Sequence, residues 1–433
     1  MNFKIYTFGC KVNQYESEQM RELLEEKGFK CTENDADAEI FIVNSCTVTA
    51  ISEGKCRRFL GRIRRKFPQS IIVLTGCMSQ AFPRKYENFD VCDVVTGNTS
   101  RHLAIELLED FIKNRNKIVD IPEHDRKCGE FEESCVSDFS ERTRAYLKIE
   151  DGCDRFCSYC VIPYARGRVR SKPLSDIRRE VETLSEKGYT EIVLVGINLS
   201  KYGTDIGLSL CDAVETVAES SGVKRIRLGS LEPELLTPDI LLRLSKVKEF
   251  CPQFHLSLQS GCDETLKRMN RHYNSAEYRE IVENIRALFH NPSFTTDVMV
   301  GFPGEDEEEF SKSLSFVSDL GFAKVHVFPY SRRSGTVADR MPDQLTKSIK
   351  DSRVAVMTAE TELRRIDFMK TQLGMVTEVL FERMFDEDYC EGYSINYIPV
   401  KVKGSSDLCH KIKTVRLLSI EGDYLIGELI ENA

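Results

Sequence analysis

The sequence predicts a multidomain α/β protein with a Rossmann-like N-terminal domain, a second run of βα units and a small antiparallel β-barrel at the end. Three observations lead to this prediction. Apolar strand patterns alternate with amphipathic helix patterns in two long regions, which is typical of parallel sheets covered by helices. A charged stretch without periodicity separates the two regions. After about residue 371 only short strand patterns remain, with glycine or acidic turns between them.

The first domain is expected over residues 1–120. Three short apolar stretches there each end at a cysteine: KIYTFG before Cys10, EIFIVNS before Cys46 and SIIVLTG before Cys77. The cysteines are 36 and 31 residues apart, about the length of a βαβ unit. Because parallel strands carry their carboxyl ends at one edge of a sheet, we expect the three thiols to converge there.

Residues 121–142 are predicted to be a linker, because they are charged and lack periodicity. Residues 143–370 contain the strand patterns AYLKIE, TEIVLVG, KRIRLGS, QFHLSL, TTDVMVG and AKVHVFP, with amphipathic helices between them. Six βα units are too few to close an eight-fold barrel. Residues 371–433 contain VTEVLFER, YIPVKVKG, KTVRLLSI and YLIGELI, which predict the small antiparallel barrel.

The composition limits the cellular setting. No run approaches the roughly 18 apolar residues of a membrane span, and the N-terminus lacks the apolar core of a signal peptide. We therefore expect a cytoplasmic protein without a membrane partner. Sixteen cysteines are many for a reducing compartment, so metal or redox chemistry is favoured over disulfides. The net charge of −9 argues against nonspecific nucleic-acid binding by the whole surface, but not by local patches.

The stretch DGCDRFCSYC places Cys153, Cys157 and Cys160 within eight residues. Iron–sulfur clusters and zinc sites usually have four protein ligands, but the next cysteine is Cys211. A four-iron cluster held by three thiolates leaves one iron open to another ligand, as in a catalytic site. The alternatives are three free thiols or half of a zinc site.

The longer motif KIEDGCDRFCSYCVIPYARGRVRS resembles the cluster loop of radical S-adenosylmethionine (SAM) enzymes. This resemblance implies that Cys153, Cys157 and Cys160 bind a [4Fe–4S] cluster whose open iron takes SAM. It implies reductive cleavage of SAM to a 5′-deoxyadenosyl radical, with Tyr159 beside the adenine. It also implies that residues 143–370 form a partial (βα)6 TIM-type radical SAM barrel, whose gap admits a large substrate.

Further cofactor-binding residues are expected at the ends of the barrel strands, where such barrels carry their functional groups. In GINLSKYG, the resemblance implies that Gly196 and Asn198 contact the amino group of SAM; a plain turn is the alternative. The fourth strand leads to Gln259 and Ser260, and the fifth contains Asp297.

The N-terminal motifs TFGCKVNQYES, NSCTVT and TGCMSQ resemble those of the methylthiotransferase family. There, the resemblance implies, Cys10, Cys46 and Cys77 hold a second [4Fe–4S] cluster with an open iron, lined by Asn13 and Asn44. Buried structural thiols are the alternative. The other ten cysteines match no ligand position, and we expect Cys128 and Cys135 to lie in a mobile stretch without a metal.

RNA binding is expected from a third resemblance and from local charge. EGYSINYIPVKVKG resembles the TRAM domain, an RNA-binding module, which assigns that role to residues 371–433. Phosphate contacts need focal positive charge; a solvated helix face is the alternative. The expected RNA-binding residues are Arg62, Arg64, Arg65, Arg166, Arg168, Lys401 and Lys403.

Together the resemblances imply a methylthiotransferase with two clusters and two SAM molecules per turnover. TFGCKVNQYES is most similar to the branch acting at C2 of N6-threonylcarbamoyladenosine next to the tRNA anticodon. The isopentenyladenosine branch typically has Gln-Met-Asn where Lys11, Val12 and Asn13 stand. The carboxylate of the threonylcarbamoyl group needs cationic partners, for which Arg268, Arg271, Arg332 and Arg333 are candidates.

Other functions remain open. Isopentenyladenosine in tRNA and an aspartate of a ribosomal protein are alternative substrates. A noncatalytic iron–sulfur protein that binds or senses RNA, and a zinc-containing RNA-binding protein, are rivals from other classes. The partners we expect are tRNA and an electron donor such as flavodoxin or ferredoxin, with the protein a monomer. No general base is evident in the sequence.

Overall fold

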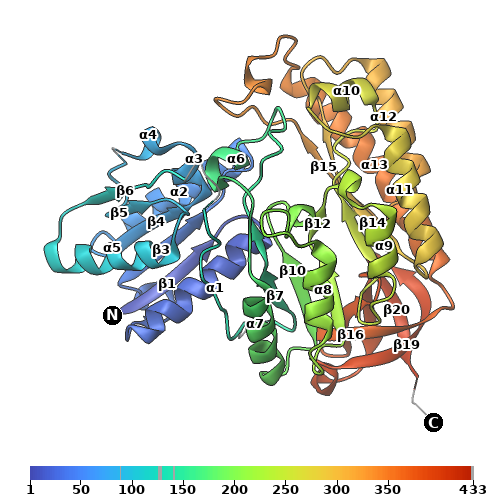
Figure 1. Ribbon diagram of the computed structural model, residues 1–433, viewed down its shortest axis with the longest axis horizontal. Helices are drawn as coiled ribbons and strands as arrows, with labels where there is room; N and C mark the ends of the chain where they lie inside the picture. The colour runs from blue at the N-terminus through green and yellow to red at the C-terminus, as the bar shows by residue number, and fades with distance from the viewer. Residues whose placement is uncertain (88, 125–128, 140–141, 431–433) are drawn as a thin grey trace.

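The computed structural model describes residues 1–87, 89–124, 129–139 and 142–430. It contains a parallel sheet at the N-terminal end, an open barrel of βα units beside it, and a small β-barrel below (Figure 1). The predicted fold class is confirmed. No helix in the described ranges has the length and apolar character that a membrane span requires.

The N-terminal sheet has the strand order β2-β1-β3-β4-β5-β6, and all its pairs are parallel. Helices lie on both of its faces (Figure 1), so every residue of β3 and β4 is buried. This two-sided burial explains why these strands are continuous apolar runs. The strands are β1 (Asn2–Thr7), β2 (Lys30–Cys31), β3 (Ile40–Ser45), β4 (Ile71–Gly76), β5 (Val94–Thr96) and β6 (Ile118–Asp120). The helices are α1 (Lys11–Glu26), α2 (Ala50–Lys66), α3 (Cys77–Ala81), α4 (Pro83–Tyr86) and α5 (Arg101–Asn114).

The second unit is a barrel that does not close. Its parallel strands form two sheets, β7-β10-β11 and β12-β13-β14-β15, joined where β12 follows β11. No pairing links β7 to β15 within the described residues. The strands are β7 (Ala145–Lys148), β10 (Glu191–Val195), β11 (Arg225–Leu228), β12 (Ser230–Leu231), β13 (Gln253–Leu256), β14 (Ser293–Val300) and β15 (Lys324–Pro329). A short antiparallel pair, β8 (Glu150–Asp151) and β9 (Arg170–Ser171), flanks the cysteine loop.

Helices cover the outside of this barrel, and the large hydrophobic core lies between strands and helices. Leu147, Leu194 and Leu256 belong to that core, whereas residues one position away, such as Lys148 and His255, face the barrel interior. The helices are α6 (Ile162–Arg166), α7 (Leu174–Glu186), α8 (Leu210–Ala218), α9 (Pro238–Leu244), α10 (Asp263–Arg268), α11 (Ser275–Leu288), α12 (Glu307–Asp319) and α13 (Lys347–Thr371).

Residues 129–139 of the predicted linker are anchored on the rest of the protein, so the expectation of a mobile stretch around Cys135 is wrong. They form no helix or strand, but Val136 and Phe139 are buried in the barrel core. The side chain of Glu22 accepts hydrogen bonds from the backbone N–H groups of Ser137 and Asp138. Apolar residues spaced through a charged segment are enough to anchor it, because its backbone finds partners on α1. Cys128 lies outside the described residues.

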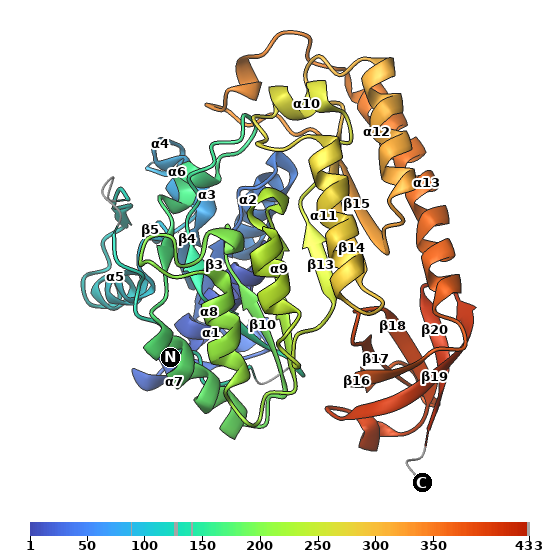
Figure 2. The ribbon, with the colours of Figure 1, turned by 45° about the vertical axis from the view of Figure 1, so that its right-hand side comes forward.

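The C-terminal barrel is closed, with the order β16-β17-β18-β20-β19. Helix α13 leads down to it from the larger barrel (Figure 2). Two features differ from the sequence prediction: β17 is an additional strand, and β18 and β20 pair in parallel. Glu391 and Gly392 interrupt the apolar pattern of β17, which concealed it. The strands are β16 (Val376–Met384), β17 (Tyr389–Ser394), β18 (Pro399–Lys403), β19 (Ile412–Glu421) and β20 (Tyr424–Leu429).

Candidate active site between two groups of cysteines

Cys10, Cys46 and Cys77 lie at the carboxyl ends of β1, β3 and β4, which are adjacent strands. Cys10 is the N-cap residue of α1 and Cys77 is the first residue of α3. Glycines allow the close approach of these loops. Gly9 has a φ of 116°, and a Cβ atom there would lie 2.9 Å from the Cβ of Cys46. Contacts under 3.0 Å force a shift, so a larger residue would push the two loops apart.

Asn13 and Asn44, expected beside this group, connect its loops. The Nδ2 atom of Asn13 donates to the carbonyls of Phe8, at 2.8 Å, and Ser45, at 3.0 Å. The Nδ2 atom of Asn44 donates to the carbonyl of Asn13 at 3.0 Å. Both side chains are buried, so they fix the positions of Cys10 and Cys46 relative to each other.

Cys153, Cys157 and Cys160 lie in the loop between β8 and α6. The loop is anchored at the end of α10. The N–H of Ser158 donates to the carbonyl of Met269 at 3.0 Å, and the hydroxyl of Ser158 donates to the carbonyl of Arg268 at 2.8 Å. Gly152 precedes the loop with a φ of 96°, and a Cβ there would lie 1.9 Å from the carbonyl oxygen of Arg168. Only glycine fits that turn.

Each sulfur of this loop faces an N–H donor. Asn198 Nδ2 lies 3.7 Å from Cys153 Sγ, Arg271 Nη1 lies 3.3 Å from Cys157 Sγ, and the backbone N–H of Ile162 lies 3.4 Å from Cys160 Sγ. In the other group, Cys77 Sγ accepts from Asn98 Nδ2 at 3.5 Å and Arg166 Nε at 3.2 Å. Such donors stabilise thiolates, the form that binds iron–sulfur clusters.

Burial raises the pKa of both Cys153 and Cys77 to about 12. These sulfurs therefore stay protonated at neutral pH unless positive charge is brought to them, as a bound metal centre does. Within the described part of the chain, no three Cys, His, Asp or Glu side chains are placed to hold a single metal ion. The donor set of each group fits a sulfur-ligated cluster.

Polar atoms beside Cys153 fit the amino group of SAM. The Oδ1 of Asn198 and the Oε1 of Glu150 are buried and have no hydrogen-bond partner among the described residues. The other carboxylate oxygen of Glu150 accepts the backbone N–H of Asn198 at 2.7 Å. Gly196 makes this possible, because a Cβ there would lie 2.6 Å from that oxygen. An ammonium group would supply the missing donors.

The other four residues expected to bind the cofactor have different surroundings. The ring of Tyr159 packs edge-on against Phe302, 6.3 Å between centroids. Gln259 has a φ of 68° and pairs with β14 through the carbonyl of Asp297. Asp297 lies 3.4 Å from His255 Nε2. The hydroxyl of Ser260 instead faces α12, where it bonds Ser313 at 3.4 Å.

Arg166 connects the two cysteine groups, and its expected contact with RNA is wrong. Its side chain is 0% exposed. Besides Cys77, it donates to Asn13 Oδ1 at 2.7 Å and to Glu16 Oε2 at 3.0 Å. Arg166 follows Cys160 closely in α6, so α6 and α3 bring the two groups together across the boundary between the units.

Sequence reasoning missed the buried ionic network around Glu16. Arg101, Lys148 and Arg166 all pair with its carboxylate, each pair with an N···O distance of at most 2.7 Å. Burial alone would raise the pKa of Glu16, but these cations outweigh it and lower the pKa to about 2. The sequence offered one signal of this network: Glu16 lies three positions after Asn13 and therefore on the same face of α1.

The other expected RNA-binding residues divide into two classes. Arg64 donates to the carbonyls of Val91 and Ser70 and pairs with Asp93, so it is committed to the fold. Lys401 is 8% exposed and lies over the rings of Phe385 and Tyr424. The guanidinium of Arg64 and the ammonium of Lys401 are therefore not free to bind phosphate, and the expectation that these two residues contact RNA is wrong. The four exposed residues are Arg62, Arg65, Arg168 and Lys403.

Of the arginines considered for the substrate carboxylate, three already have carboxylate partners near the barrel mouth. Arg268 pairs with Glu309, Arg271 with Glu232, and Arg332 with Asp339. Arg333 pairs with Glu53 of α2, across the boundary between the units.

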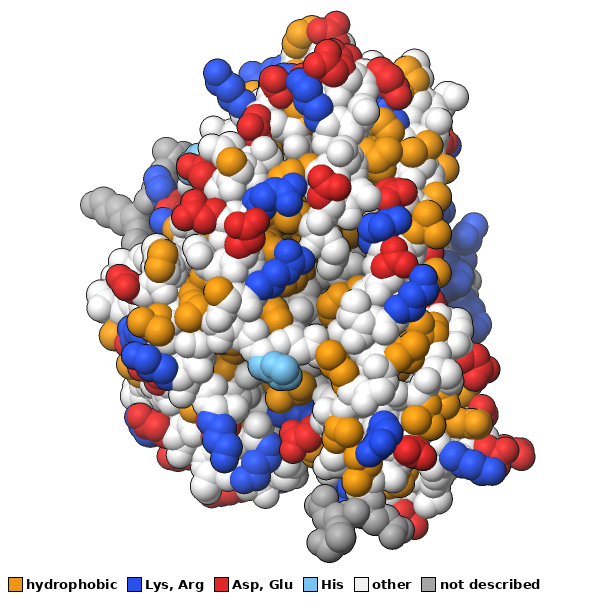
Figure 3. All heavy atoms as spheres, turned by 90° about the vertical axis from the view of Figure 1, so that its right-hand side faces the viewer, with side chains coloured by type: hydrophobic (Ala, Val, Ile, Leu, Met, Phe, Trp, Pro, Cys, Tyr) orange, Lys and Arg blue, Asp and Glu red, His pale blue; other side chains and the backbone are white. Residues whose placement is uncertain are grey.

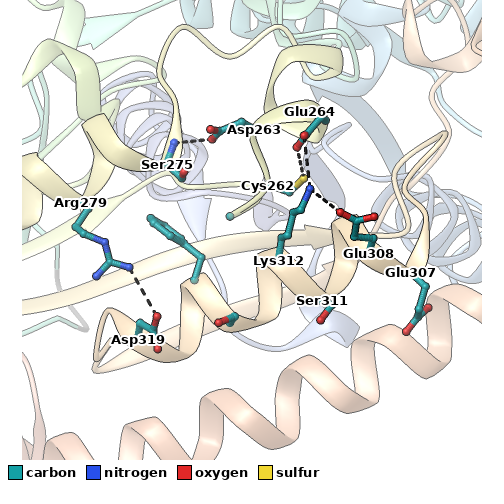
Figure 4. A pocket seen from close by; sticks show the side chains of 13 residues that line it. Cys262, Asp263, Glu264, Ser275, Arg279, Glu307, Glu308, Ser311, Lys312 and Asp319 are labelled. Atoms are coloured by element: carbon teal, nitrogen blue, oxygen red, sulfur yellow. Dashed lines mark hydrogen bonds and ion pairs between the residues drawn. The ribbon is translucent and has the colours of Figure 1, made fainter.

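A cavity of about 860 Å³ is not part of this site. It lies on the outside of the barrel between α11 and α12, where Glu264 and Glu308 surround Lys312 (Figure 4). The face that includes these helices has interspersed basic and acidic side chains and no continuous basic patch (Figure 3). Neither feature points to RNA binding on that side.

Comparisons with known proteins place these features in a family. A model of the radical SAM superfamily matches residues 147–317, and the model "Uncharacterized protein family UPF0004" matches residues 2–97. The matches contain the second and the first group of cysteines, respectively.

Curated relatives match nearly the full chain. The threonylcarbamoyladenosine tRNA methylthiotransferase MtaB of Bacillus subtilis is 34% identical, over 98% of this chain and 95% of the relative. That of Thermotoga maritima is 37% identical, over 97% and 95%. A tRNA-2-methylthio-N(6)-dimethylallyladenosine synthase of Clostridium botulinum is 34% identical, over 99% and 96%. Overall identity alone does not separate these two activities.

Among solved structures, the radical SAM methyltransferase TsrM of Kitasatospora setae is similar in fold. The TM-score is 0.57 at 14% identity, and the match covers 78% of this chain and 76% of that one. The likeness supports the arrangement of a Rossmann-like unit beside a radical SAM barrel.

Proposed function

The chain belongs to the radical SAM methylthiotransferase family, and from this premise we propose that it adds a methylthio group to C2 of N6-threonylcarbamoyladenosine next to the tRNA anticodon. Membership makes the protein an enzyme acting on tRNA by radical SAM chemistry. It also implies a [4Fe–4S] cluster, SAM and an electron donor. The exact nucleoside, a second cluster and a second SAM per turnover are our proposal.

The contact between α3 and α6 carries this proposal, because it brings the two three-thiol groups together at the boundary between the N-terminal unit and the larger barrel. Cys153, Cys157 and Cys160 would hold the SAM-binding cluster, and Cys10, Cys46 and Cys77 a second one. When bound, the first would supply reductive cleavage of SAM, with one electron from the electron donor, and the second would supply the sulfur atom.

The chain's own residues would bind and shield the reactants. Asn198 and Glu150 would accept hydrogen bonds from the SAM ammonium, since their free oxygens are buried beside Cys153. Val12 of α1 packs against Val193 and Val195 in the barrel. This apolar contact would keep water away from the radical.

The choice of nucleoside rests on charge. Lys11, where the isopentenyladenosine branch typically has glutamine, makes no hydrogen bond or ion pair within the described ranges. Burial of its ammonium group and the nearby Arg144 and Arg227 lower the pKa of Lys11 to about 8, and a substrate carboxylate would favour its charged form. The exposed basic residues and the C-terminal barrel would bind the tRNA. We further propose a cytoplasmic monomer that receives electrons from flavodoxin or ferredoxin.

Direct competition tests the substrate. Anaerobically reconstituted enzyme with SAM and reductant is given equal amounts of tRNA carrying threonylcarbamoyladenosine and tRNA carrying isopentenyladenosine. We expect methylthiolation of the first, since unpaired polar groups can discriminate by several orders of magnitude. Preferential reaction of the second, or of a ribosomal protein, would overturn the substrate. Failure to cleave SAM, or zinc without sulfide, would favour the noncatalytic alternatives.

A further inference from the structure

A second cavity, of about 270 Å³, lies at the boundary between the N-terminal unit and the barrel. The orange loop after β15 extends toward the N-terminal unit there (Figure 1), and Ser331 of that loop accepts the backbone N–H of Ala50 at 3.1 Å. The lining residues are Ala50, Glu53, Gly54, Arg57, Phe82, Lys85, Arg332, Arg333 and Ser334.

The cavity carries excess positive charge. Ala50, Glu53, Gly54 and Arg57 form one stripe at the start of α2, where the helix dipole also favours anions. Arg57 is exposed and has no carboxylate partner among the described residues. Arg333 and Lys85 share the carboxylate of Glu53, at 2.8 and 3.7 Å. Arg332 is neutralised by Asp339, so the other three cations face a single carboxylate.

A buried, incompletely bonded arginine forms one wall. Arg333 is 4% exposed and lies over the ring of Phe82. Its Nη2 donates to Thr47 Oγ1 at 2.6 Å and to Glu53 Oε2 at 2.8 Å, while its Nε has no partner among the described residues. Thr47 directly follows Cys46. Arg333 therefore connects the wall of the cavity to the loop that carries Cys46.

We propose that this cavity binds the threonylcarbamoyl group of the substrate, with its carboxylate held by Arg57, Lys85 and Arg333. The inference rests on the proposed function and names a site for its specificity. Glu53 and Ser334 would bond the hydroxyl and N–H groups of the same substituent, whereas an isopentenyl chain would leave Arg57 and the Nε of Arg333 without partners. The position beside Thr47 favours a group on the reacting base over a distant phosphate.

The test measures binding without turnover. Reconstituted holoenzyme binds three anticodon stem-loops that differ at one adenosine: threonylcarbamoyl, its neutral methylamide, and unmodified. We expect wild-type protein to prefer the carboxylate over the amide roughly tenfold or more, as for hydrogen bonds to charged groups. The double variant Arg57→Met with Lys85→Met should bind the two RNAs equally.

A matched control removes the same charge outside the cavity. Lys55→Met with Arg84→Met changes exposed residues of α2 and α4 that do not line it, and this variant should keep the preference. Melting temperature and iron content verify that each variant is folded and loaded.

Three outcomes would overturn the inference. Equal weakening of all three RNAs by the cavity variant would assign the site to a backbone phosphate. An unchanged preference would remove the cavity from recognition. Loss of the preference in Lys11→Gln, with the cavity variant unaffected, would move the carboxylate to Lys11. Product analysis separates these from failure of the proposed function: tighter binding and methylthiolation of isopentenyladenosine RNA would reject both.

Discussion

The Nε atom of Arg166 donates a hydrogen bond to the Sγ atom of Cys77 at 3.2 Å. Arg166 belongs to α6, which follows the barrel cysteines, and Cys77 is the first residue of α3 in the N-terminal unit. The same guanidinium bonds Asn13 and Glu16. A single buried side chain therefore positions both groups of cysteines relative to each other.

Replacing Arg166 with methionine should destabilise the contact between the two units. Removal of one partner from a buried ion pair costs about 3–5 kcal/mol, and Glu16 would keep only Arg101 and Lys148. We expect the melting temperature to fall by several degrees. Arg168→Met, which changes an exposed arginine two residues away, should melt as wild type does. Equal melting of both variants would contradict this role of Arg166.

The two cysteine groups should have separable functions. Alanine at Cys153, Cys157 and Cys160 should abolish reductive SAM cleavage yet leave iron and sulfide for one cluster. Alanine at Cys10, Cys46 and Cys77 should leave SAM cleavage but stop methylthiolation, since the sulfur site is lost. Deoxyadenosine and methylthioadenosine products are measured together with iron content. Methylthiolation over several turnovers by the N-terminal variant would show that its cysteines do not supply the sulfur site.

The Glu16 network should make the protein sensitive to acid. The pKa of Glu16 is about 2 in the folded protein and 4.5 when unperturbed. A lowered pKa contributes stability above the unfolded value, and this is lost as the pH falls through the folded one. Glu16→Gln should therefore melt lower than wild type at pH 7, with the difference shrinking between pH 4.5 and 2.

Glu18→Gln serves as the control for that experiment. Glu18 lies on the same helix but pairs with Arg21 near the surface, and its side chain is 26% exposed. Its substitution should change the pH dependence little. A constant difference between Glu16→Gln and wild type at all pH values would contradict the assignment.

Charge reversal at Arg62 and Arg65 should weaken tRNA binding. Both are exposed on α2, and each lost phosphate contact should lower the slope of log K against log salt by roughly 0.7–0.9. Arg64 is left unchanged because its bonds hold the fold. Reversal of Lys347 and Lys370, exposed on α13, is the charge-matched control. Equal affinities and slopes for both variants would mean that Arg62 and Arg65 only face solvent.

Local patterns were sufficient for the three strands that end near Cys10, Cys46 and Cys77 and for six strands of the larger barrel, but they did not identify β2, β5 and β6. A buried parallel strand is a continuous apolar run, so Cys10, Cys46 and Cys77 could be placed at strand ends from neighbouring residues alone. The pattern failed at β17, where Glu391 and Gly392 break the alternation. It also failed at residues 129–139, whose anchoring depends on Glu22 of a different helix.

The order of the folding units, the two three-thiol groups and the class of chemistry could be predicted from the sequence, because they depend on spacing along the chain. Which charged side chains are free depends on tertiary contacts. Arg64 lies two residues from the exposed Arg62, yet it is fixed by Asp93. Arg166 lies two residues from the exposed Arg168, yet it is fixed by Glu16. Both carboxylates are distant along the chain. The cavity beside Thr47 likewise combines α2, α4 and the loop after β15. Ion pairs and cavities arise from contacts between distant segments, which no local periodicity encodes.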